Sequence, residues 1–240
     1  MNILVTGGAY GLGGAITKIL AKDSNNNVYF SYRNSDVEAK KIESEFSNAV
    51  AIPCDFGDND SLMMFIDKIS QFDLDVLINN AYNGDYLKTY FHKISSNDFL
   101  IDFKENIIPV VEITQSVITN FRKKKQGKII TILTSALVNT PPIGSSVYVA
   151  NKAYLEKLTK VWAVENAKFN ITSNSVSPSF MKTNLTARFD DRIIEQMIET
   201  HPLKKILTVD EVAETILFLT SASSQINGVD ILLNAGAIIK

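Results

Sequence analysis

NILVTGGAYGLGG, residues 2–14, is the stretch that decides the fold of this chain. Its continuous apolar run predicts a short buried strand over 2–6, and apolar residues at helical spacing follow the last glycine. Between strand and helix, Gly7 allows a tight turn, Gly11 lets the backbone approach a phosphate, and Gly13 lets the two elements pack closely. This layout binds a dinucleotide pyrophosphate at the helix N-terminus, although a glycine turn without a ligand is an open alternative.

Length and composition limit the functional classes. The 240 residues fit a single domain, 1–240, and the net charge of −2 gives no sign of a nucleic-acid or membrane partner. Cys54 is the only cysteine, and the two histidines, His92 and His201, are far apart, so no disulfide framework and no metal site are expected. Glycines interrupt the N-terminal apolar run, and no stretch is long enough to span a membrane, so a cytoplasmic location is expected.

Strand-like and helix-like runs alternate to the end of the chain. Beyond the first strand, strands are predicted over 28–32, 49–53, 75–79, 128–134, 172–176 and 230–233. Helices are predicted over 37–46, 62–69, 99–121 and 148–167, with Pro109 as an interruption of the third. The alternation predicts an α/β, Rossmann-like doubly wound fold with a seven-stranded parallel sheet and helices on both faces. Residues 179–207 break the alternation and are expected to form a substrate lid.

Polar side chains follow several predicted strands, at the edge where a doubly wound sheet binds its ligands. Tyr148 and Lys152 are four residues apart and therefore share one helix face. A phenol has a pKa of about 10, and a nearby ammonium lowers that pKa. The pair then suits Tyr148 as an acid for a carbonyl being reduced, or as a base for an alcohol being oxidised. Ser135 is placed to donate a hydrogen bond to the same carbonyl oxygen.

The order of these residues resembles the short-chain dehydrogenase/reductase family over nearly the whole chain. The family's Thr-Gly-x-x-x-Gly-x-Gly is matched by residues 6–13, and its Tyr-x-x-x-Lys by Tyr148 and Lys152. Its catalytic serine, thirteen residues before the tyrosine, is matched by Ser135, and the asparagine of its long helix by Asn106. The resemblance implies an enzyme in which these four residues are catalytic, with Asn106 holding a water that relays protons from Lys152.

The resemblance also implies a nicotinamide cofactor. Lys152 is expected to bind the nicotinamide ribose, Asp55 the adenine, and Thr183 the nicotinamide carboxamide. The whole set of expected cofactor-binding residues is Thr6, Gly7, Gly11, Leu12, Gly13, Arg33, Asn34, Asp55, Phe56, Asn80, Ala81, Tyr148, Lys152, Pro178 and Thr183.

The residues after the second predicted strand favour NADP(H) over NAD(H). An acid there would bind the adenosine ribose of NAD, but here Tyr32 is followed by Arg33 and Asn34. A guanidinium suits a 2′-phosphate, with hydroxyl and amide donors in support. The alternative is that Arg33 pairs with Asp36 or Asp58 and contacts no phosphate.

Three positions depart from the family's pattern. Tyr82 stands where the family's Asn-Asn-Ala-Gly has its glycine, Ser179 replaces the glycine after Pro178, and Ala235 replaces the first of two late glycines. Tyr82 puts bulk near the cofactor or the substrate wall, which leaves the size and shape of the substrate open. None of the three removes a reacting group, so activity is expected.

Among the subgroups, the chain is most similar to the 3-oxoacyl-[acyl-carrier-protein] reductases, in the segments 121–128 and 227–236. The resemblance implies reduction of a small-molecule or acyl-carrier-bound ketone to a secondary alcohol. The basic run 121–128 would dock an acidic carrier protein, although a solvated, positively charged helix end is the favoured interpretation. A sugar or another small ketone is an alternative substrate. A non-catalytic dinucleotide sensor is an alternative function, and the intact Ser135, Tyr148 and Lys152 argue against it.

A homodimer or homotetramer is expected on the helices over 99–121 and 148–167, with Leu155, Leu158, Val161 and Trp162 as candidate contacts. An apolar wall is expected from side chains of the lid, namely Phe180, Met181, Leu185, Phe189, Ile193 and Met197.

Overall fold

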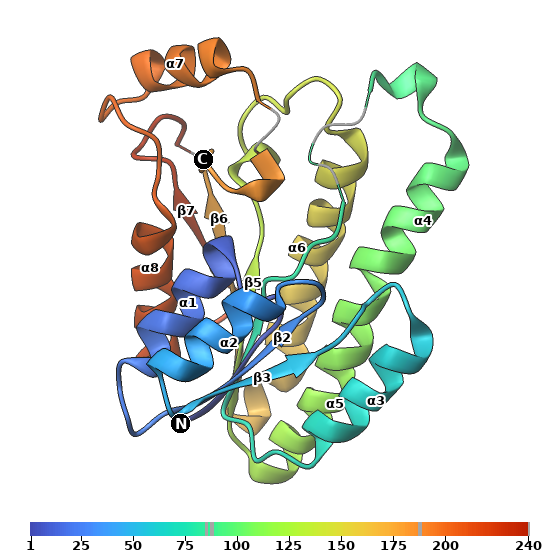
Figure 1. Cartoon of the computed structure of the whole chain (residues 1–240), viewed down its shortest axis with the longest axis vertical. Helices are drawn as coiled ribbons and strands as arrows, with labels where there is room; N and C mark the ends of the chain where they lie inside the picture. The colour runs from blue at the N-terminus through green and yellow to red at the C-terminus, as the bar shows by residue number, and fades with distance from the viewer. Residues whose placement is uncertain (85, 87–88, 187–188, 240) are drawn as a thin grey trace.

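The computed structural model describes residues 1–84, 86, 89–186 and 189–239 (Figure 1). Its strands form one parallel sheet in the order β3-β2-β1-β4-β5-β6-β7. They are β1 Asn2–Val5, β2 Asn27–Tyr32, β3 Ala49–Pro53, β4 Val76–Asn79, β5 Gly127–Ile132, β6 Ile171–Pro178 and β7 Asp230–Leu233. The predicted seven-stranded, Rossmann-like sheet is confirmed. The strand order reverses between β1 and β4, which is the position where such sheets bind their ligands.

Helices lie on both faces of the sheet. They are α1 Gly11–Ala21, α2 Asp36–Glu45, α3 Asn59–Ser70, α4 Ser96–Asn106, α5 Ile108–Lys124, α6 Ser146–Asn166, α7 Asp191–Thr200 and α8 Val209–Ser221. Short 3₁₀ turns are η1 Phe91–Lys93, η2 Ser135–Leu137, η3 Ala167–Phe169 and η4 Asn184–Thr186. Within the described residues, none of the helices combines the length and the apolar character needed to cross a membrane.

Side chains on the two faces of the sheet form two separate cores. Along β1, Ile3 and Val5 point to one face and Leu4 to the other, and all three are fully buried. The first face is covered by α1, α2 and α8, and the second by α3, α5 and α6 (Figure 1). A strand covered on both faces needs apolar side chains at every position, which explains the continuous apolar run of β1.

The predicted helix over 99–121 is divided into two helices. Ile107 is both the last cap of α4 and the first cap of α5, and Pro109 lies in the first turn of α5. Proline is tolerated there because its missing N–H would have no partner within the helix. The predicted interruption at Pro109 is confirmed, and as a result Asn106 is the last residue of α4.

Helix α8 lies in a part of the chain for which no element was predicted. The helix begins with a capping box, in which the Thr208 hydroxyl accepts from the Glu211 N–H and the Glu211 carboxylate accepts from the Thr208 N–H. Val212 and Ile216 are fully buried in the core that α1 also covers. A threonine that is followed three residues later by glutamate, and then by apolar residues, is a sequence pattern that predicts the start of such a helix.

Residues 179–207 contain η4, α7 and a single β-bridge between Met181 and Leu207. Figure 1 shows α7 beyond the carboxyl ends of β6 and β7. The segment therefore lies at the ligand-binding edge of the sheet, although residues 187 and 188 fall outside the described part of the chain.

Candidate active site

A cleft of about 690 Å³ lies at the carboxyl ends of the strands. It runs from the glycine-rich turn after β1 to the start of α6. Of the expected site residues, those that line it are Gly7, Gly11, Leu12, Gly13, Arg33, Asn34, Asp55, Phe56, Asn80, Ala81, Ser135, Tyr148, Lys152, Pro178 and Thr183. Thr6 and Asn106 lie behind this lining and hold parts of it in place.

The turn requires its glycines for different physical reasons. Gly7 and Gly11 have φ angles of +63° and +55°, the left-handed region that favours glycine. A Cβ at Gly13 would lie 1.9 Å from the Gly7 carbonyl oxygen, so only glycine fits between the turn and α1. A Cβ at Gly11 would meet nothing within 4 Å. Gly11 therefore presents bare backbone to open space at the start of α1, as a phosphate cradle requires.

Asn80 fixes the turn to the end of β4. Its Nδ2 donates to the carbonyl oxygens of Thr6 at 2.9 Å and Gly7 at 3.1 Å. The Thr6 hydroxyl in turn accepts from the N–H groups of Asn80 and Ala81, each at 3.0 Å. The Gly7 N–H donates to the Ser31 hydroxyl on β2 at 2.9 Å. Thr6 and Asn80 thus set the shape of the cleft wall.

At the far end of the cleft, Arg33 and Asp55 face each other across the ends of β2 and β3. Their closest charged atoms, Nη1 and Oδ1, are 4.0 Å apart, and both side chains are about half exposed. Among the described residues, Arg33 therefore meets Asp55 rather than the expected alternatives Asp36 and Asp58. A long, exposed ion pair contributes little free energy, so the guanidinium stays available to an anion.

Lys152 is buried one helical turn after Tyr148 on α6. Its ammonium group donates to the carbonyl oxygen of Ile132, at the end of β5, over 2.7 Å. It also lies over the Tyr148 ring, 5.8 Å from the ring centroid. Burial lowers the pKa of Lys152 to about 8, so the amine is still largely protonated at neutral pH.

The pKa of Tyr148 differs from the expectation. Burial raises it above its ordinary value, the nearby Tyr86 raises it further, and a hydrogen bond with Thr134 opposes both. The expected lowering by Lys152 is not among the causes of the shift, and removing the phenol from water disfavours the phenolate. Tyr148 is therefore held as a neutral phenol. Neither Thr134 nor Tyr86 was predicted as a site residue. Thr134 was signalled only by its place beside Ser135, and Tyr86 by nothing in the sequence.

Ser135 begins η2 and is nearly buried in the cleft wall. Its hydroxyl accepts a long hydrogen bond of 3.4 Å from Asn139 Nδ2. Ser135, which follows β5, thus shares one cleft with Tyr148 and Lys152 of α6, as expected.

Asn106 holds the segment that follows β4. Its Oδ1 accepts from the Asn83 N–H at 2.6 Å, and its Nδ2 donates to the Asn83 carbonyl at 2.8 Å. The same Nδ2 lies 3.1 Å from both the main-chain and the side-chain oxygen of Asp102. The side chain is therefore engaged with neighbouring segments. Its expected role in a proton relay stays a prediction.

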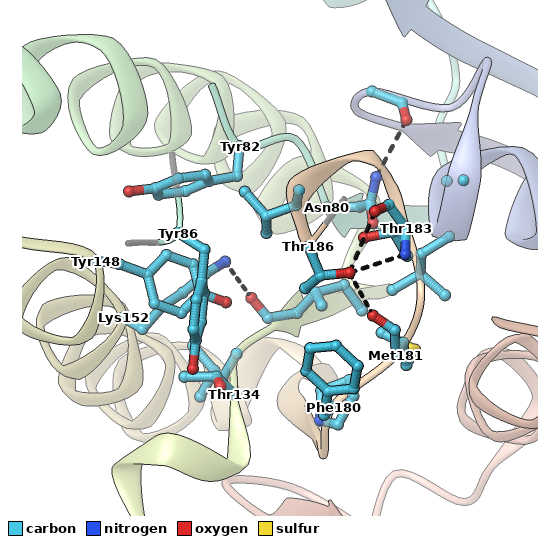
Figure 2. Close-up of a pocket in the computed structure, with 18 of the residues that line it drawn as sticks. Asn80, Tyr82, Tyr86, Thr134, Tyr148, Lys152, Phe180, Met181, Thr183 and Thr186 are labelled. Atoms are coloured by element: carbon cyan, nitrogen blue, oxygen red, sulfur yellow. Dashed lines mark hydrogen bonds between the residues drawn. The ribbon is translucent and has the colours of Figure 1, made fainter. Parts of the chain in front are cut away.

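Aromatic rings cover Tyr148 from the cleft side. Tyr82 contacts it edge-on with centroids 5.0 Å apart, and Tyr86 lies 4.6 Å from it. Tyr86 also contacts Phe189, which contacts Phe180 at 5.0 Å. Figure 2 shows these tyrosines gathered over Tyr148. Of the expected apolar wall, the residues in the cleft are Phe180, Met181, Leu185, Phe189 and Met197, whereas Ile193 does not line it.

The three departures from the family's pattern have different structural consequences. Tyr82 enters the wall of the cleft, as expected. Ser179 needs no left-handed backbone, and its N–H donates to the Leu233 carbonyl at 2.9 Å. Ala235 has a φ of +52°, which is strained for a residue with a Cβ.

Thr183 lies on a turn held by Thr186. The Thr186 hydroxyl accepts from the Thr183 N–H at 2.9 Å and donates to the Met181 carbonyl at 2.6 Å (Figure 2). This turn places Thr183 in the cleft wall after Pro178. In the described part of the chain, no group of three or more His, Cys, Asp or Glu side chains is arranged to hold a metal ion.

Comparison with known proteins identifies the family. The sequence model of the family described as enoyl-(acyl carrier protein) reductase matches residues 7–237. A 3-oxoacyl-[acyl-carrier-protein] reductase of Buchnera aphidicola is 33% identical over 239 residues, which cover 97% of this chain and 95% of that protein. The chain belongs to the short-chain dehydrogenase/reductase family. As the sequence predicted, it is an NAD(P)-dependent short-chain dehydrogenase/reductase that resembles the 3-oxoacyl reductases.

Two further proteins are similar to this chain over nearly its whole length. The acetoacetyl-CoA reductase of Cupriavidus necator is 29% identical, with 97% of this chain and 96% of that protein covered. A solved structure of the 3-ketoacyl-(acyl-carrier-protein) reductase from Brucella melitensis, complexed with NADH, is 24% identical and has a TM-score of 0.88, with 99% of this chain and 98% of that chain covered. At 24% identity, the likeness shows that this chain has the same fold as the Brucella melitensis protein.

Proposed function

We propose that this short-chain dehydrogenase/reductase uses NADPH to reduce the ketone of a 3-oxoacyl thioester, with Tyr148 as the general acid. The observation that carries the proposal is that Ser135, Tyr148 and Lys152 share one cleft with the glycine-rich turn after β1. Two relatives are named for the reduction of such thioesters, one as a 3-oxoacyl-[acyl-carrier-protein] reductase and the other as an acetoacetyl-CoA reductase.

The residues around the turn fit a dinucleotide. The open space in front of Gly11 and the close approach at Gly13 suit a phosphate held by the free N–H groups at the start of α1. Thr183 and Lys152 would hold the nicotinamide half, and Asp55 the adenine. When bound, the dinucleotide supplies the hydride that reduces the ketone. Arg33 supports the choice of NADP(H), because its long ion pair leaves the guanidinium free to bind a 2′-phosphate.

The side chains of α6 and η2 supply the proton chemistry. Tyr148 is kept neutral by burial and so is ready to donate its proton to the carbonyl oxygen. Ser135 donates a hydrogen bond to the same oxygen and stabilises the charge that develops there. Lys152, mostly protonated at neutral pH, stabilises the phenolate that remains on Tyr148. We keep the water-holding role of Asn106 as part of this proposal.

The segment 179–207 is proposed as the substrate lid, because Phe180 and Phe189 reach Tyr86 and the catalytic tyrosine through ring contacts. Such an apolar wall suits an acyl chain better than a sugar. It is the reason for preferring a thioester over the alternative of a polar sugar ketone.

The basic run 121–128 gives little support to carrier docking. It lies at the end of α5 and the start of β5, on the edge of the sheet opposite the carboxyl ends that form the cleft. Arg122 Nε donates to Asn166 Oδ1 at 2.7 Å, and Lys124 pairs with Asp73 and Asp75. Lys128 donates to a main-chain carbonyl. We therefore assign this run to helix-end stabilisation and not to a partner.

We propose a homodimer or homotetramer on the two long helical runs, the first formed by α4 and α5 and the second by α6. Two of the expected contacts are wrong, because Leu155 and Trp162 are buried in the core of the subunit. Val161 is 45% exposed and remains a candidate, as does Leu158, which is only partly buried. Further exposed apolar side chains on these helices are Leu100, Ile101, Ile108, Tyr154 and Val164. A monomeric mass in sedimentation at working concentration would contradict the proposal.

The test is NADPH or NADH consumption with a panel of 3-oxoacyl thioesters, sugar ketones and small ketones. We expect turnover of the thioesters with NADPH, and a rise in the NADPH dissociation constant of about tenfold or more in Arg33→Ala with little change for NADH. Preference for NADH, or an Arg33→Ala variant with unchanged NADPH affinity, would refute the cofactor assignment. Tight NADPH binding without any turnover would favour the sensor.

A further inference from the structure

Tyr82 stands where the family's pattern has a glycine, and its side chain reaches both halves of the catalytic pair. Its ring contacts the Tyr148 ring edge-on, with centroids 5.0 Å apart. The Lys152 ammonium lies 5.4 Å from the centroid of the same Tyr82 ring. A glycine at this position would make neither contact. Tyr82 therefore adds a surface against Lys152 that the family's motif does not supply.

A buried carboxylate anchors this ring. The Tyr82 hydroxyl donates to Asp102 Oδ1 at 2.9 Å, and Asp102 is only 4% exposed. The same oxygen accepts from Asn106 Nδ2 at 3.1 Å and from Asn151 Nδ2 at 2.8 Å. Asp102 thus joins the segment after β4, α4 and α6. Since Asn151 directly precedes Lys152, the anchor holds Tyr82 in a defined place relative to that lysine.

The contacts around the Lys152 ammonium leave it few alternative positions. It donates to the Ile132 carbonyl, and it lies over two rings, those of Tyr82 and Tyr148, within the distance at which a ring quadrupole attracts a cation. Figure 2 shows the rings gathered around the end of the lysine side chain. We propose that Tyr82, anchored by Asp102, is a positioning residue that holds the Lys152 ammonium against Tyr148.

The titratable groups that contact Lys152, or that contact the two rings packed on it, come from three elements. Tyr148 lies on α6 itself, Tyr82 and Tyr86 come from the segment after β4, and Asp102 comes from α4. Burial pulls the pKa of Lys152 down to about 8. The ring of Tyr82 opposes this effect of burial on the pKa of Lys152, because the ring attracts the protonated amine.

The inference rests on the proposed function for its catalytic meaning, so its test has a readout that needs no turnover. The pKa of Lys152 is measured in the full-length protein by NMR of labelled lysine, with the signal assigned by its loss in Lys152→Met. Tyr82→Leu removes the ring. If this variant fails to fold, Tyr82→Met removes the ring with a more adaptable side chain. Tyr82→Phe keeps the ring but loses the hydrogen bond to Asp102. Tyr86→Leu is the matched control, since it removes the other tyrosine packed on Tyr148.

We expect Tyr82→Leu or Tyr82→Met to lower the pKa of Lys152 by about one unit. Tyr82→Phe should lower it by less than half as much, and Tyr86→Leu should leave it near the wild-type value. Unchanged titration in the ring-deleting variants would overturn the inference. So would an equal fall in the Tyr86→Leu control, because the cause would then be a general change in burial.

The kinetic counterpart is the pH profile of ketone reduction. Because the reaction needs a protonated Lys152, the alkaline limb of kcat/KM should move to lower pH in Tyr82→Leu, with kcat affected more than KM. If the wild-type protein turned over no ketone, the proposed function would fail while the titration still tested the contact. If turnover were normal and neither the titration nor the pH profile moved, the inference alone would fail.

Discussion

Two alanine substitutions in the glycine-rich turn separate folding from cofactor binding. At Gly13, an added Cβ would lie 1.9 Å from the Gly7 carbonyl oxygen and 2.6 Å from Asn80 Nδ2. Real Cβ atoms essentially never approach other atoms within 3.0 Å, so the turn and α1 must separate by about 1.1 Å. At Gly11, the added Cβ meets nothing within 4 Å, and only the φ of +55° opposes it.

The two costs in stability differ accordingly. Overpacking against backbone costs about 3 kcal/mol or more, which lowers the Tm of a chain of this size by about 6–12 °C. A left-handed alanine costs about 1–2 kcal/mol, partly offset by the reduced freedom of the unfolded chain, so Gly11→Ala should lower the Tm by only about 2–4 °C. Its Cβ would nevertheless occupy the space in which a phosphate must sit.

Thermal unfolding with and without NADPH measures both effects. At a hundredfold excess over the dissociation constant, a ligand stabilises by about 2.7 kcal/mol, or about 5–10 °C here. We expect wild type to show this shift, Gly11→Ala to lose it while keeping most of its own Tm, and Gly13→Ala to lose both. A Gly13→Ala variant as stable as wild type would refute the packing role of Gly13. A Gly11→Ala variant with the full NADPH-induced rise in Tm would refute the phosphate-binding role of Gly11.

Two further predictions concern stability. Ala235→Gly should raise the free energy of unfolding by about 0.5–1 kcal/mol, because glycine relieves the left-handed φ at this position; a lower Tm would contradict it. The pKa of Glu211 is held down to about 2, chiefly by Lys205 and then by Thr208, so the charge stabilises the protein above about pH 4.5 and this contribution is lost as the pH falls toward 2. Urea titrations should therefore show Glu211→Gln to be less stable than wild type at pH 7, with the difference shrinking by pH 3.5; a constant difference would count against the assignment.

The sheet and the turn were predictable because their causes are local. Continuous apolar runs mark strands covered on both faces, and the glycine spacing follows from contacts within a single strand–turn–helix unit. The chain order of Ser135, Tyr148 and Lys152 predicted that they meet at the carboxyl edge of the sheet. The structure places them in one cleft there, with Ser135 after β5 and the other two on α6. The interruption at Pro109 followed in the same way from the chemistry of one residue.

What could not be predicted depends on contacts between distant segments. The rings of Tyr82 and Tyr86 meet Tyr148 across more than sixty residues of chain, and no periodicity reports such a meeting. Tyr148 is buried where these rings pack on it, and burial raises its pKa. The lowering of this pKa that helical spacing alone predicted was therefore wrong. Leu155 and Trp162 were assigned to a subunit contact because a helical stripe does not say which neighbour covers it.

We propose that the buried phenol of Tyr148 delivers the proton to the ketone oxygen. The most direct test is single-turnover reduction of a 3-oxoacyl thioester by the Tyr148→Phe variant saturated with NADPH, with NADPH binding measured on the same sample. We expect intact NADPH binding and a fall in the reduction rate of about a hundredfold or more. A variant that binds NADPH normally and reduces the thioester at the wild-type rate would contradict it.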